Sequence, residues 1–240
     1  VAAFFSSYEE AFSTIPTAML SGYGQCYQQA EFYDASNKEN AENMKVIDRY
    51  NKSIDYPVLV WLREAFTDSS KVFDLGGNMG YGYYSYQRSI PYPATLSWTV
   101  CELPEVVEAG KRMLKTIDSP GLSYTTDVAD AEGSEILLTC GTLQYLEPSL
   151  AKCLEPLATK PRHLIVHNVP MYDGEEYFTH QNLIPACAPY KIQNRSQFLA
   201  SLNCLGYEVI DSWEVDRTCR IPFHPERFVK AYCGFYLRKM

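Results

Sequence analysis

The segment from Val72 to Gly80 constrains the fold of this 240-residue chain more than any other stretch. It reads Val-Phe-Asp-Leu-Gly-Gly-Asn-Met-Gly, which predicts a buried strand that ends at an acid and turns through glycines into a helix. Glycines adopt turn angles that other residues resist, and without a Cβ atom they let a ligand approach the main chain. The segment therefore predicts an α/β protein that holds a nucleotide-like cofactor at the end of a strand.

The spacing of the glycines distinguishes between cofactors. A dinucleotide-binding turn has the form G-x-G-x-x-G, but Leu75 stands where a triplet ending at Gly80 needs its first glycine. The pattern present is D-x-G-x-N-x-G, which begins at Asp74. It resembles the first motif of the class I S-adenosylmethionine-dependent methyltransferases, with Asn78 where many members carry glycine. A purely structural turn between a strand and a helix is the alternative.

Composition narrows the class of protein further. A net charge of -8 argues against a broad nucleic-acid-binding surface, because phosphate contacts need clustered lysine and arginine. No apolar run approaches the roughly 18 residues of a membrane span, and the N-terminus lacks the pattern of a signal peptide. The eight cysteines are scattered, without C-x-x-C pairs or histidines at zinc spacing. We therefore expect a cytoplasmic protein with no bound metal.

The order of the predicted elements indicates two parts. Residues 1–70 read as a helical cap segment without strands, and residues 71–240 read as a Rossmann-like domain. In this domain strands alternate with helices up to a fifth strand, and two last strands follow with no helix between them. The predicted strands are residues 71–75, 97–102, 122–126, 134–140, 162–167, 207–214 and 231–239, and the predicted helices are residues 80–89, 104–116, 149–158 and 196–205.

The two last strands are expected to pair as a hairpin. Such an ending resembles the class I methyltransferase fold, in which an antiparallel last strand is inserted into an otherwise parallel sheet. Buried parallel strands are apolar along their length, as residues 162–167 are between their ends. We therefore predict a Rossmann-like α/β fold with a mostly parallel seven-stranded sheet, a C-terminal antiparallel hairpin and an N-terminal helical cap.

The resemblance also implies where the cofactor, S-adenosylmethionine, binds. In this fold a cofactor crosses the carboxyl ends of the first three strands. Glu102 ends the second strand, where a carboxylate can accept hydrogen bonds from both ribose hydroxyls. A surface acid that caps the next helix is the alternative. The implied cofactor-binding residues are Asp74, Gly76, Gly77, Asn78, Gly80, Glu102, Leu103, Asp127, Val128, Gly141 and Thr142.

Methyl transfer to a hydroxyl needs a base that removes the acceptor's proton. Candidates follow the fourth and fifth strands, and we predict His167 and His180 for this role. A lone histidine is more often a hydrogen-bonded structural residue, which is the alternative for both. The predicted lining of the acceptor pocket is Tyr23, Tyr81, Gln144 and Tyr145, with core or rim packing as the alternative for the tyrosines.

Short motifs near the N-terminus and in the C-terminal half resemble a bacterial family of methyltransferases associated with surface-polysaccharide gene neighbourhoods. The C-terminal motifs are residues 178–182, 189–195 and 205–213. The resemblance implies a small acceptor such as a sugar, a nucleotide sugar or a glycan hydroxyl. By the same match Thr179, Gln181 and Asn182 become acceptor-site candidates.

Two other functions stay open on the sequence alone. Asn78 in place of glycine is compatible with a catalytically degenerate fold that serves as a scaffold or binding subunit, although asparagine tolerates left-handed backbone angles. A nicotinamide-dependent oxidoreductase is the weaker alternative, because the glycine spacing is wrong and no Tyr-x-x-x-Lys motif occurs. The predicted partner is a small-molecule or glycan acceptor, with no nucleic acid and no membrane span.

Overall fold

The computed structural model describes residues 4–20, 53–182 and 187–240. The chain divides into two compact units. The glycine-loop unit consists of Gly24–Thr139 and Leu157–Ile165, and the C-terminal unit consists of Val1–Tyr23, Cys140–Pro156 and Val166–Met240. Among the described residues, no helix has the length and apolar character needed to cross a membrane.

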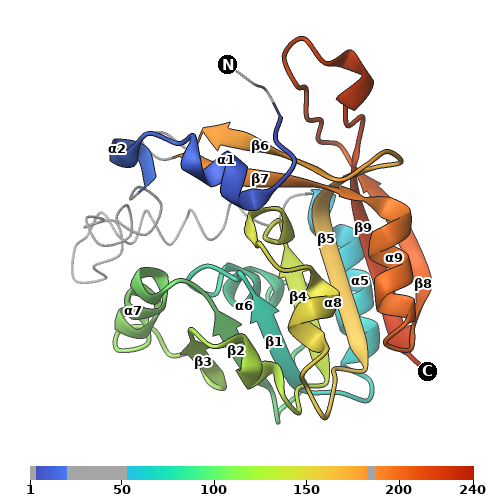
Figure 1. The fold of residues 1–240 in the computed structure, drawn as a ribbon. Helices are drawn as coiled ribbons and strands as arrows, with labels where there is room; N and C mark the ends of the chain where they lie inside the picture. The colour runs from blue at the N-terminus through green and yellow to red at the C-terminus, as the bar shows by residue number, and fades with distance from the viewer. Residues whose placement is uncertain (1–3, 21–52, 183–186) are drawn as a thin grey trace. The chain divides into compact units, whose positions relative to one another are not determined.

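The glycine-loop unit is built on parallel strands. β1 (Lys71–Leu75) lies between β2 (Ser97–Cys101) and β4 (Ile136–Cys140), and β3 (Leu122–Thr125) pairs with the other side of β2 (Figure 1). β1 and β4 are buried along almost their whole length, which their apolar sequences predict. The described helices of this unit are η2 (Ser53–Asp55), α5 (Tyr56–Ala65), α6 (Tyr81–Tyr86), α7 (Pro104–Met113) and η3 (Val128–Ala131).

The register of these strands brings their carboxyl ends to one edge. Leu75 is paired with Cys101, and Cys101 is paired with Thr125. The alignment continues one residue further, because the N–H of Gly76 donates to the carbonyl of Cys101 at 2.8 Å. In the same way, the N–H of Glu102 donates to the carbonyl of Thr125 at 3.1 Å. Strand pairing alone therefore makes the glycine turn and Glu102 neighbours.

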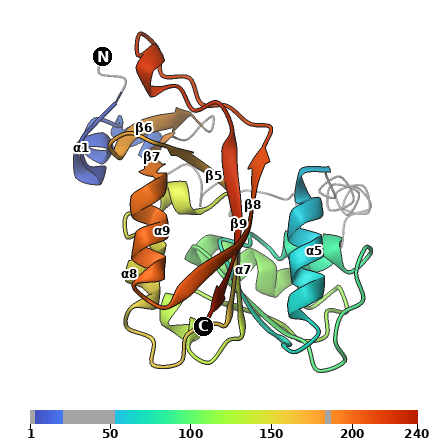
Figure 2. The same cartoon turned by 90° about the vertical axis from the view of Figure 1, so that its right-hand side faces the viewer.

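The C-terminal unit contains two antiparallel strand pairs. Its strand pairs are β6 (Tyr177–Asn182) with β7 (Cys187–Asn194), and β8 (Tyr207–Val215) with β9 (Tyr232–Lys239). In Figure 2, α9 (Arg195–Asn203) runs alongside the β8–β9 pair, and the ring of Phe198 lies 6.0 Å from that of Phe235. The other described helices of the unit are α1 (Tyr8–Ser13), α2 (Thr17–Leu20), η4 (Leu143–Tyr145), α8 (Leu150–Leu154) and η5 (Pro225–Arg227).

The strand order confirms the predicted fold class. β5 (His163–Tyr172) contributes residues to both units. Along hydrogen-bonded neighbours the order is β3-β2-β1-β4-β5-β7-β6, and β9 pairs with both β5 and β8. The path β3-β2-β1-β4-β5-β9-β8 therefore contains the seven predicted strands, and its last pair, β8–β9, is the predicted antiparallel hairpin.

The β6–β7 pair is an addition that the sequence pattern does not predict. Its residues, 177–194, include several polar side chains and Pro189, and they lack the clear alternation of a half-buried strand. β7 joins the end of β5 through parallel pairing of Met171 with Gln193 and of Tyr172 with Asn194. The two strands are neighbours in the chain, with Asn182 opposite Cys187, so the prediction missed them because the alternation is absent and Pro189 interrupts the pattern.

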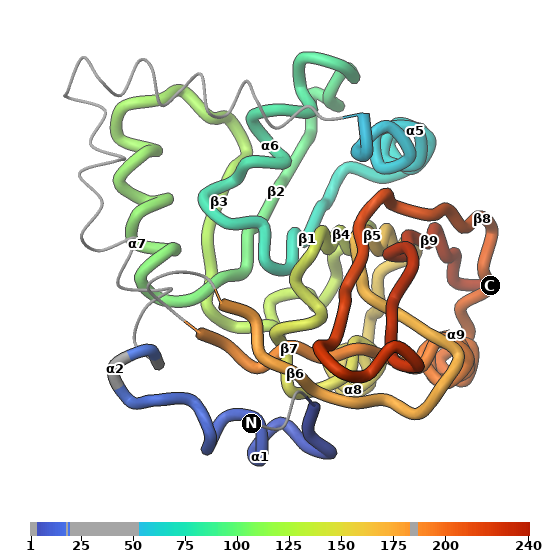
Figure 3. The backbone as a smooth tube through the Cα atoms, turned by 90° about the horizontal axis from the view of Figure 1, so that it is seen from above, coloured from blue at the N-terminus to red at the C-terminus, as the bar shows by residue number. Residues whose placement is uncertain are grey.

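The N-terminal segment packs on β6. Phe5 and Phe178 form an antiparallel bridge with N–O distances of 2.7 and 2.9 Å. α1 starts at the N-cap residue Ser7, whose hydroxyl accepts a hydrogen bond from the N–H of Glu10 at 3.1 Å. Figure 3 shows α1 beside β6 and β7, and Ala11 of α1 is buried against Phe5 and Phe178. The N-terminal end of the predicted cap is thus attached to the C-terminal unit.

A glycine in β9 provides a test of the predicted hairpin. Gly234 is paired with Trp213 of β8, and an added Cβ atom would lie 2.1 Å from the indole Nε1. We expect Gly234→Ala to lower the free energy of unfolding by about 1–3 kcal/mol, because the indole must move. In a Trp213→Ala background the same change should cost less than about 0.5 kcal/mol. Urea denaturation followed by circular dichroism measures both costs, and equal costs contradict this packing.

Candidate functional site

The turn from Gly76 to Gly80 depends on left-handed backbone angles. The angle φ is 75° at Gly76, 55° at Asn78 and 87° at Gly80. Asparagine enters this region more readily than most residues with a side chain. The Asn78 Oδ1 atom also accepts a hydrogen bond from the N–H of Met79 at 2.8 Å. Asparagine at this position therefore preserves the shape of the turn.

The carboxyl group of Asp74 lies directly against the turn. The residue is 2% exposed, and a Cβ atom added to Gly77 would lie 2.3 Å from Asp74 Oδ2. The indole N–H of Trp98 donates to the same oxygen at 3.1 Å. Position 77 has no space for a side chain, so the turn is shaped by a buried acid. Direct contact of Asp74 with the amino group of a ligand stays a prediction.

Burial also changes the protonation of this acid. It raises the pKa of Asp74 to about 7, because the charged form loses its hydration. The hydrogen bond from Trp98 opposes this effect, and the nearby carboxylate of Glu102 adds to it. Asp74 is therefore close to its titration midpoint at neutral pH.

Glu102 reaches from the end of β2 to the glycine turn. Its Oε1 atom accepts from the N–H of Asn78 at 3.2 Å, and its Oε2 atom accepts from the N–H of Leu103 at 2.9 Å. Burial raises the pKa of Glu102, and these two main-chain hydrogen bonds lower it. Each carboxylate oxygen has two acceptor positions, so each has a further position for a ligand hydroxyl. The bond to Asn78 favours a role at the turn over simple capping of α7.

Two aromatic residues that motif spacing does not reveal support the turn. Trp98 of β2 binds Asp74, and Tyr124 of β3 donates its hydroxyl proton to the carbonyl of Met79 at 2.7 Å. A Cβ atom on Gly110 of α7 would lie 2.3 Å from the Tyr124 ring, so this glycine makes room for it. A glycine inside a predicted helix is the one sequence signal for such close packing.

Three further predicted residues follow β2 and β3 at the same edge. Leu103, next to the half-buried Glu102, is 47% exposed, which is unusual for a large apolar side chain. Asp127 is exposed, and its Oδ1 atom accepts from the N–H of Ala129 at 2.8 Å as the N-cap of η3. Val128 is half-buried. A contact of these residues with an adenine ring stays a prediction.

In the C-terminal unit, the segment after β4 turns sharply at Gly141. Its φ is 72°, and its N–H donates to the carbonyl of His167 at 2.9 Å. An added Cβ atom would lie 2.9 Å from the side-chain nitrogen of Asn168. Gln144 Nε2 donates to the carbonyl of Gly141 at 2.7 Å, and Thr142 is the N-cap of η4 between them. The predicted residues Gly141, Thr142 and Gln144 therefore lie in one tight turn.

Two buried amide oxygens lie near this turn, one on Gln144 of the turn and one on Asn168 of β5. Among the described residues, neither Gln144 Oε1 nor Asn168 Oδ1 has a hydrogen-bond partner, although both atoms are buried. Asn168 also has a left-handed φ of 61°. Buried acceptors without a partner are costly and mark positions where a ligand or water can donate. Asn168 was not predicted. It lies within β5, directly after the stretch 162–167 that was predicted as a buried strand, and this place is the signal that could have identified it.

The β6–β7 pair contacts the segment after β4. The hydroxyl of Tyr145 donates to Gln181 Oε1 at 2.7 Å, and the Tyr145 ring lies 5.3 Å from that of Tyr190 in a T-shaped contact. Lys191 Nζ donates to the carbonyl of Glu147 at 2.7 Å. Lys191 is 3% exposed, and burial lowers its pKa. Tyr145 and Gln181, both predicted acceptor residues, are thus direct partners.

The remaining acceptor candidates have different surroundings. Thr179 is buried on β6 opposite Tyr190, and Asn182 is exposed at the end of the same strand. Tyr81 belongs to the glycine-loop unit and begins α6 directly after the turn. Tyr23 lies outside the described residues. An acceptor role for these four residues stays a prediction.

The contacts of His167 favour a positioning role over the predicted base. Its ring is buried, and the indole N–H of Trp213 donates to Nδ1 at 3.0 Å. An indole nitrogen can only donate, so the neutral histidine carries its proton on Nε2. A second proton on Nδ1 would break the bond to Trp213. His167 therefore has no acceptor nitrogen that can take a proton without losing this contact.

The contacts of His180 favour the structural alternative as well. His180 Nε2 lies 2.8 Å from the carbonyl of Ala11 and 3.1 Å from the hydroxyl of Thr14. Its ring centroid lies 4.7 Å from that of Phe5. These contacts join β6 to the N-terminal segment, so His180 holds two elements together.

Several solved methyltransferase structures have a fold similar to that of this chain. The 1,6-didemethyltoxoflavin-N1-methyltransferase from Burkholderia thailandensis matches 100% of this chain and 93% of its own, with 14% identity and a TM-score of 0.51. The magnesium protoporphyrin IX methyltransferase ChlM from Synechocystis PCC 6803, solved with S-adenosylmethionine bound, matches 91% of this chain and 92% of its own, with 10% identity and a TM-score of 0.54. The chain has the class I methyltransferase fold.

A third structure with this fold was solved in the presence of a sugar. The N-terminal domain of EvdMO1, with S-adenosylhomocysteine and D-fucose, matches 79% of this chain and 84% of its own, with 15% identity and a TM-score of 0.52. No protein-family model matches the sequence, and no curated protein is similar to it at a significant level. Likeness at such low identity shows the fold and leaves function to be argued from the site.

The pKa of Asp74 predicts how stability depends on pH. An aspartate in the unfolded chain titrates near about pH 4, whereas the folded protein keeps this proton until about pH 7. The folded state therefore binds more protons between these values, and stability falls as pH rises through this window, by up to about 4 kcal/mol. Asp74→Asn, which keeps an acceptor for Trp98, should remove this fall.

The measurement is urea denaturation of both proteins at pH 5, 6, 7 and 8, values placed about the window that linkage defines. Asp118→Asn serves as the control, because Asp118 is an exposed acid of the same unit. The control should follow the unchanged protein. If Asp74→Asn does so too, the buried acid is not the source of the pH dependence.

Proposed function

We propose that this protein is an S-adenosylmethionine-dependent methyltransferase that acts on a small acceptor. The observation that carries the proposal is the carboxylate of Glu102, which spans from the end of β2 to the main chain of the glycine turn. Each of its oxygens has a further acceptor position for one ribose hydroxyl. Proteins with the same fold are known with S-adenosylmethionine or S-adenosylhomocysteine bound.

The geometry of the glycine turn supports S-adenosylmethionine as the cofactor independently of Glu102. Cβ atoms would lie 2.3 Å from Asp74 Oδ2 at Gly77 and 3.1 Å from Tyr124 Oη at Gly80, so the main chain of the turn packs directly on Asp74 and Tyr124. We assign the methionine end of the cofactor to this turn and the ribose to Glu102. The exposed side chain of Leu103 offers an apolar surface for adenine. Asp127 and Val128 are its expected partners on the other side.

The charges of the site also suit this cofactor. S-adenosylmethionine carries a sulfonium and an ammonium group, and Asp74 and Glu102 are two acids at one turn. A bound cation nearby favours the ionised form of a carboxyl group. Cofactor binding should therefore lower the raised pKa of both acids, and it should tighten as pH rises through about 7.

The chemical step needs mainly alignment from the protein. When bound, S-adenosylmethionine would supply a methyl group on a positively charged sulfur; an acceptor would bond to the methyl carbon from the opposite side as the carbon–sulfur bond breaks, and S-adenosylhomocysteine would leave. The protein contributes a turn fixed by Asp74, Trp98 and Tyr124, which orients this end of the cofactor. Such positioning and the exclusion of water account for most of the rate in reactions of this type. His167 is proposed as a positioning residue, since its carbonyl holds Gly141.

We further propose a sugar, a nucleotide sugar or a glycan hydroxyl as the acceptor, in surface-polysaccharide biosynthesis. Gln144 Oε1 and Asn168 Oδ1 are buried acceptors, which suit a ligand rich in hydroxyl donors. Tyr145, which follows Gln144 in the chain, adds a hydroxyl that is hydrogen-bonded to Gln181 of β6. The motif resemblance points to the same class of acceptor, and the EvdMO1 domain was studied with D-fucose.

Calorimetry with S-adenosylmethionine, S-adenosylhomocysteine and NADH tests the proposed cofactor. Both sulfur compounds should bind and NADH should not. Glu102→Ala should weaken their binding by about 10- to 150-fold, the range for a lost hydrogen bond to a charged group. Glu105→Ala, which removes a half-buried acid from the first turn of α7, should leave the affinity unchanged.

Other results of these binding measurements would favour other functions or remove single assignments. Absence of binding by either sulfur compound contradicts the proposed function, and NADH binding instead favours the oxidoreductase alternative. Unchanged affinity in Glu102→Ala removes the ribose assignment. Cofactor binding without methyl transfer across a panel of nucleotide sugars and glycans favours the scaffold alternative or a different acceptor class.

A further inference from the structure

The loop between β8 and β9, residues 216–231, presents an aromatic side chain at an unusual backbone position. Phe223 is 96% exposed, and its φ is 65°. A bulky residue rarely adopts a left-handed conformation, and it persists there only when the surrounding structure holds it. Exposure of a whole phenylalanine side chain is costly in water. The exposure and the backbone angle of Phe223 therefore indicate that this loop has a function.

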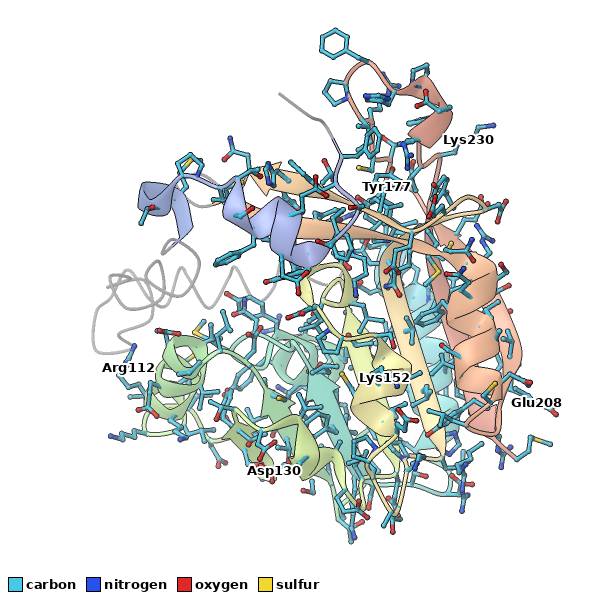
Figure 4. All side chains as sticks on the ribbon, in the orientation of Figure 1. Arg112, Asp130, Lys152, Tyr177, Glu208 and Lys230 are labelled. Carbon is cyan, nitrogen blue, oxygen red and sulfur yellow. The ribbon has the colours of Figure 1, made fainter. Side chains whose placement is uncertain are left out.

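The base of the loop is firmly anchored. Cys219 and Val229 form an antiparallel bridge with N–O distances of 3.0 and 2.9 Å. The hydroxyl of Tyr177 on β6 donates to the carbonyl of Arg227 at 2.7 Å. The guanidinium of Arg227 lies 3.8 Å from the ring centroid of Phe4 and 4.8 Å from that of Tyr177. Figure 4 shows Tyr177 near this base and Lys230 on the arm that returns to β9.

The tip of the loop forms a shallow hollow that is open to solvent. Its volume is about 340 Å³, and its lining is Arg220, Ile221, Phe223, His224, Pro225 and Phe228. The guanidinium of Arg220 lies 5.4 Å from the ring centroid of Phe228. The hollow thus combines apolar walls with a cationic group, and the exposed Phe223 stands at its rim.

The charge of the loop differs from that of the chain. Its basic residues are Arg217, Arg220, Arg227 and Lys230, and its acidic residues are Asp216 and Glu226, whereas the chain as a whole has a net charge of -8. At physiological salt, charges further than about 8 Å away are largely screened. A partner at the tip therefore meets a local excess of positive charge.

We propose that this loop docks the protein on the surface of a bilayer that contains anionic lipids. Phosphate groups at such a surface attract the basic residues, and the acyl region below them accepts the Phe223 ring. A protein partner would need a patch of about 800 Å² on each side, but the apolar groups here sit on a projecting tip. The proposal is independent of the proposed methyl transfer.

Vesicle sedimentation with the full chain tests the proposal. The probes are vesicles of phosphatidylcholine alone and vesicles of phosphatidylcholine and phosphatidylglycerol at a ratio of about 2:1. The protein should sediment with the anionic vesicles and not with the neutral ones, and salt should release it. Failure to bind anionic vesicles at low salt overturns the proposal, as does equal binding to both kinds.

Substitutions in the loop test which of its residues contact the bilayer. Phe223→Ser should weaken binding at least about 10-fold, because it removes a whole apolar side chain. Arg220→Gln combined with Lys230→Gln should weaken binding about 25-fold, since each basic residue contributes about fivefold at an anionic surface. The controls are Phe12→Ser, a 45% exposed phenylalanine on α1, and Lys111→Gln combined with Lys152→Gln, two exposed lysines elsewhere. Equal losses in loop and control variants overturn the proposal.

A second measurement uses a substitution that keeps an aromatic ring at the tip of the loop. Phe223→Trp keeps a large aromatic ring at the tip and adds a fluorophore, and brominated lipids quench tryptophan within the acyl region. Binding should quench this variant more than the unchanged protein, which has three tryptophans of its own. Binding with no additional quenching contradicts insertion of the tip.

Discussion

The contact between the Asp74 carboxyl group and Gly77 is the constraint on which the candidate site depends. The acid is buried against main chain that has no room for a Cβ atom, and Trp98 holds its oxygen. This packing fixes the turn that Glu102 then reaches from the end of β2. The same burial raises the pKa of Asp74 to about 7, so the contact that shapes the site also makes its charge sensitive to pH.

Much of this arrangement follows from local sequence. The apolar strands, the acid at the end of β1 and the glycine spacing predicted the turn, and the two final strands predicted the β8–β9 pair. Glu102 was predicted because an acid that ends the neighbouring parallel strand must lie at the same edge. These features depend on short patterns, which a single sequence displays directly.

Other features depend on contacts that no local pattern contains. β6 and β7 pair through residues without clear alternation, and Lys191 is buried on β7 although lysine seldom is. Tyr124 supports the turn through a hydroxyl that only the folded register brings to Met79. His180 was predicted as a base from its residue type and its place after the fifth strand, and its partners lie far away along the chain at Ala11 and Thr14. Its role as a base stays a prediction, because residue type and chain position do not report tertiary partners.

Hydrogen–deuterium exchange with and without S-adenosylhomocysteine reports where the cofactor binds without knowledge of the acceptor. We expect slower exchange in peptides that cover residues 74–82 and 100–104, where the N–H groups of Asn78 and Leu103 bond to Glu102. Protection confined to other segments, or no protection at saturating ligand, would contradict the assignment of the glycine turn and Glu102 as the cofactor site.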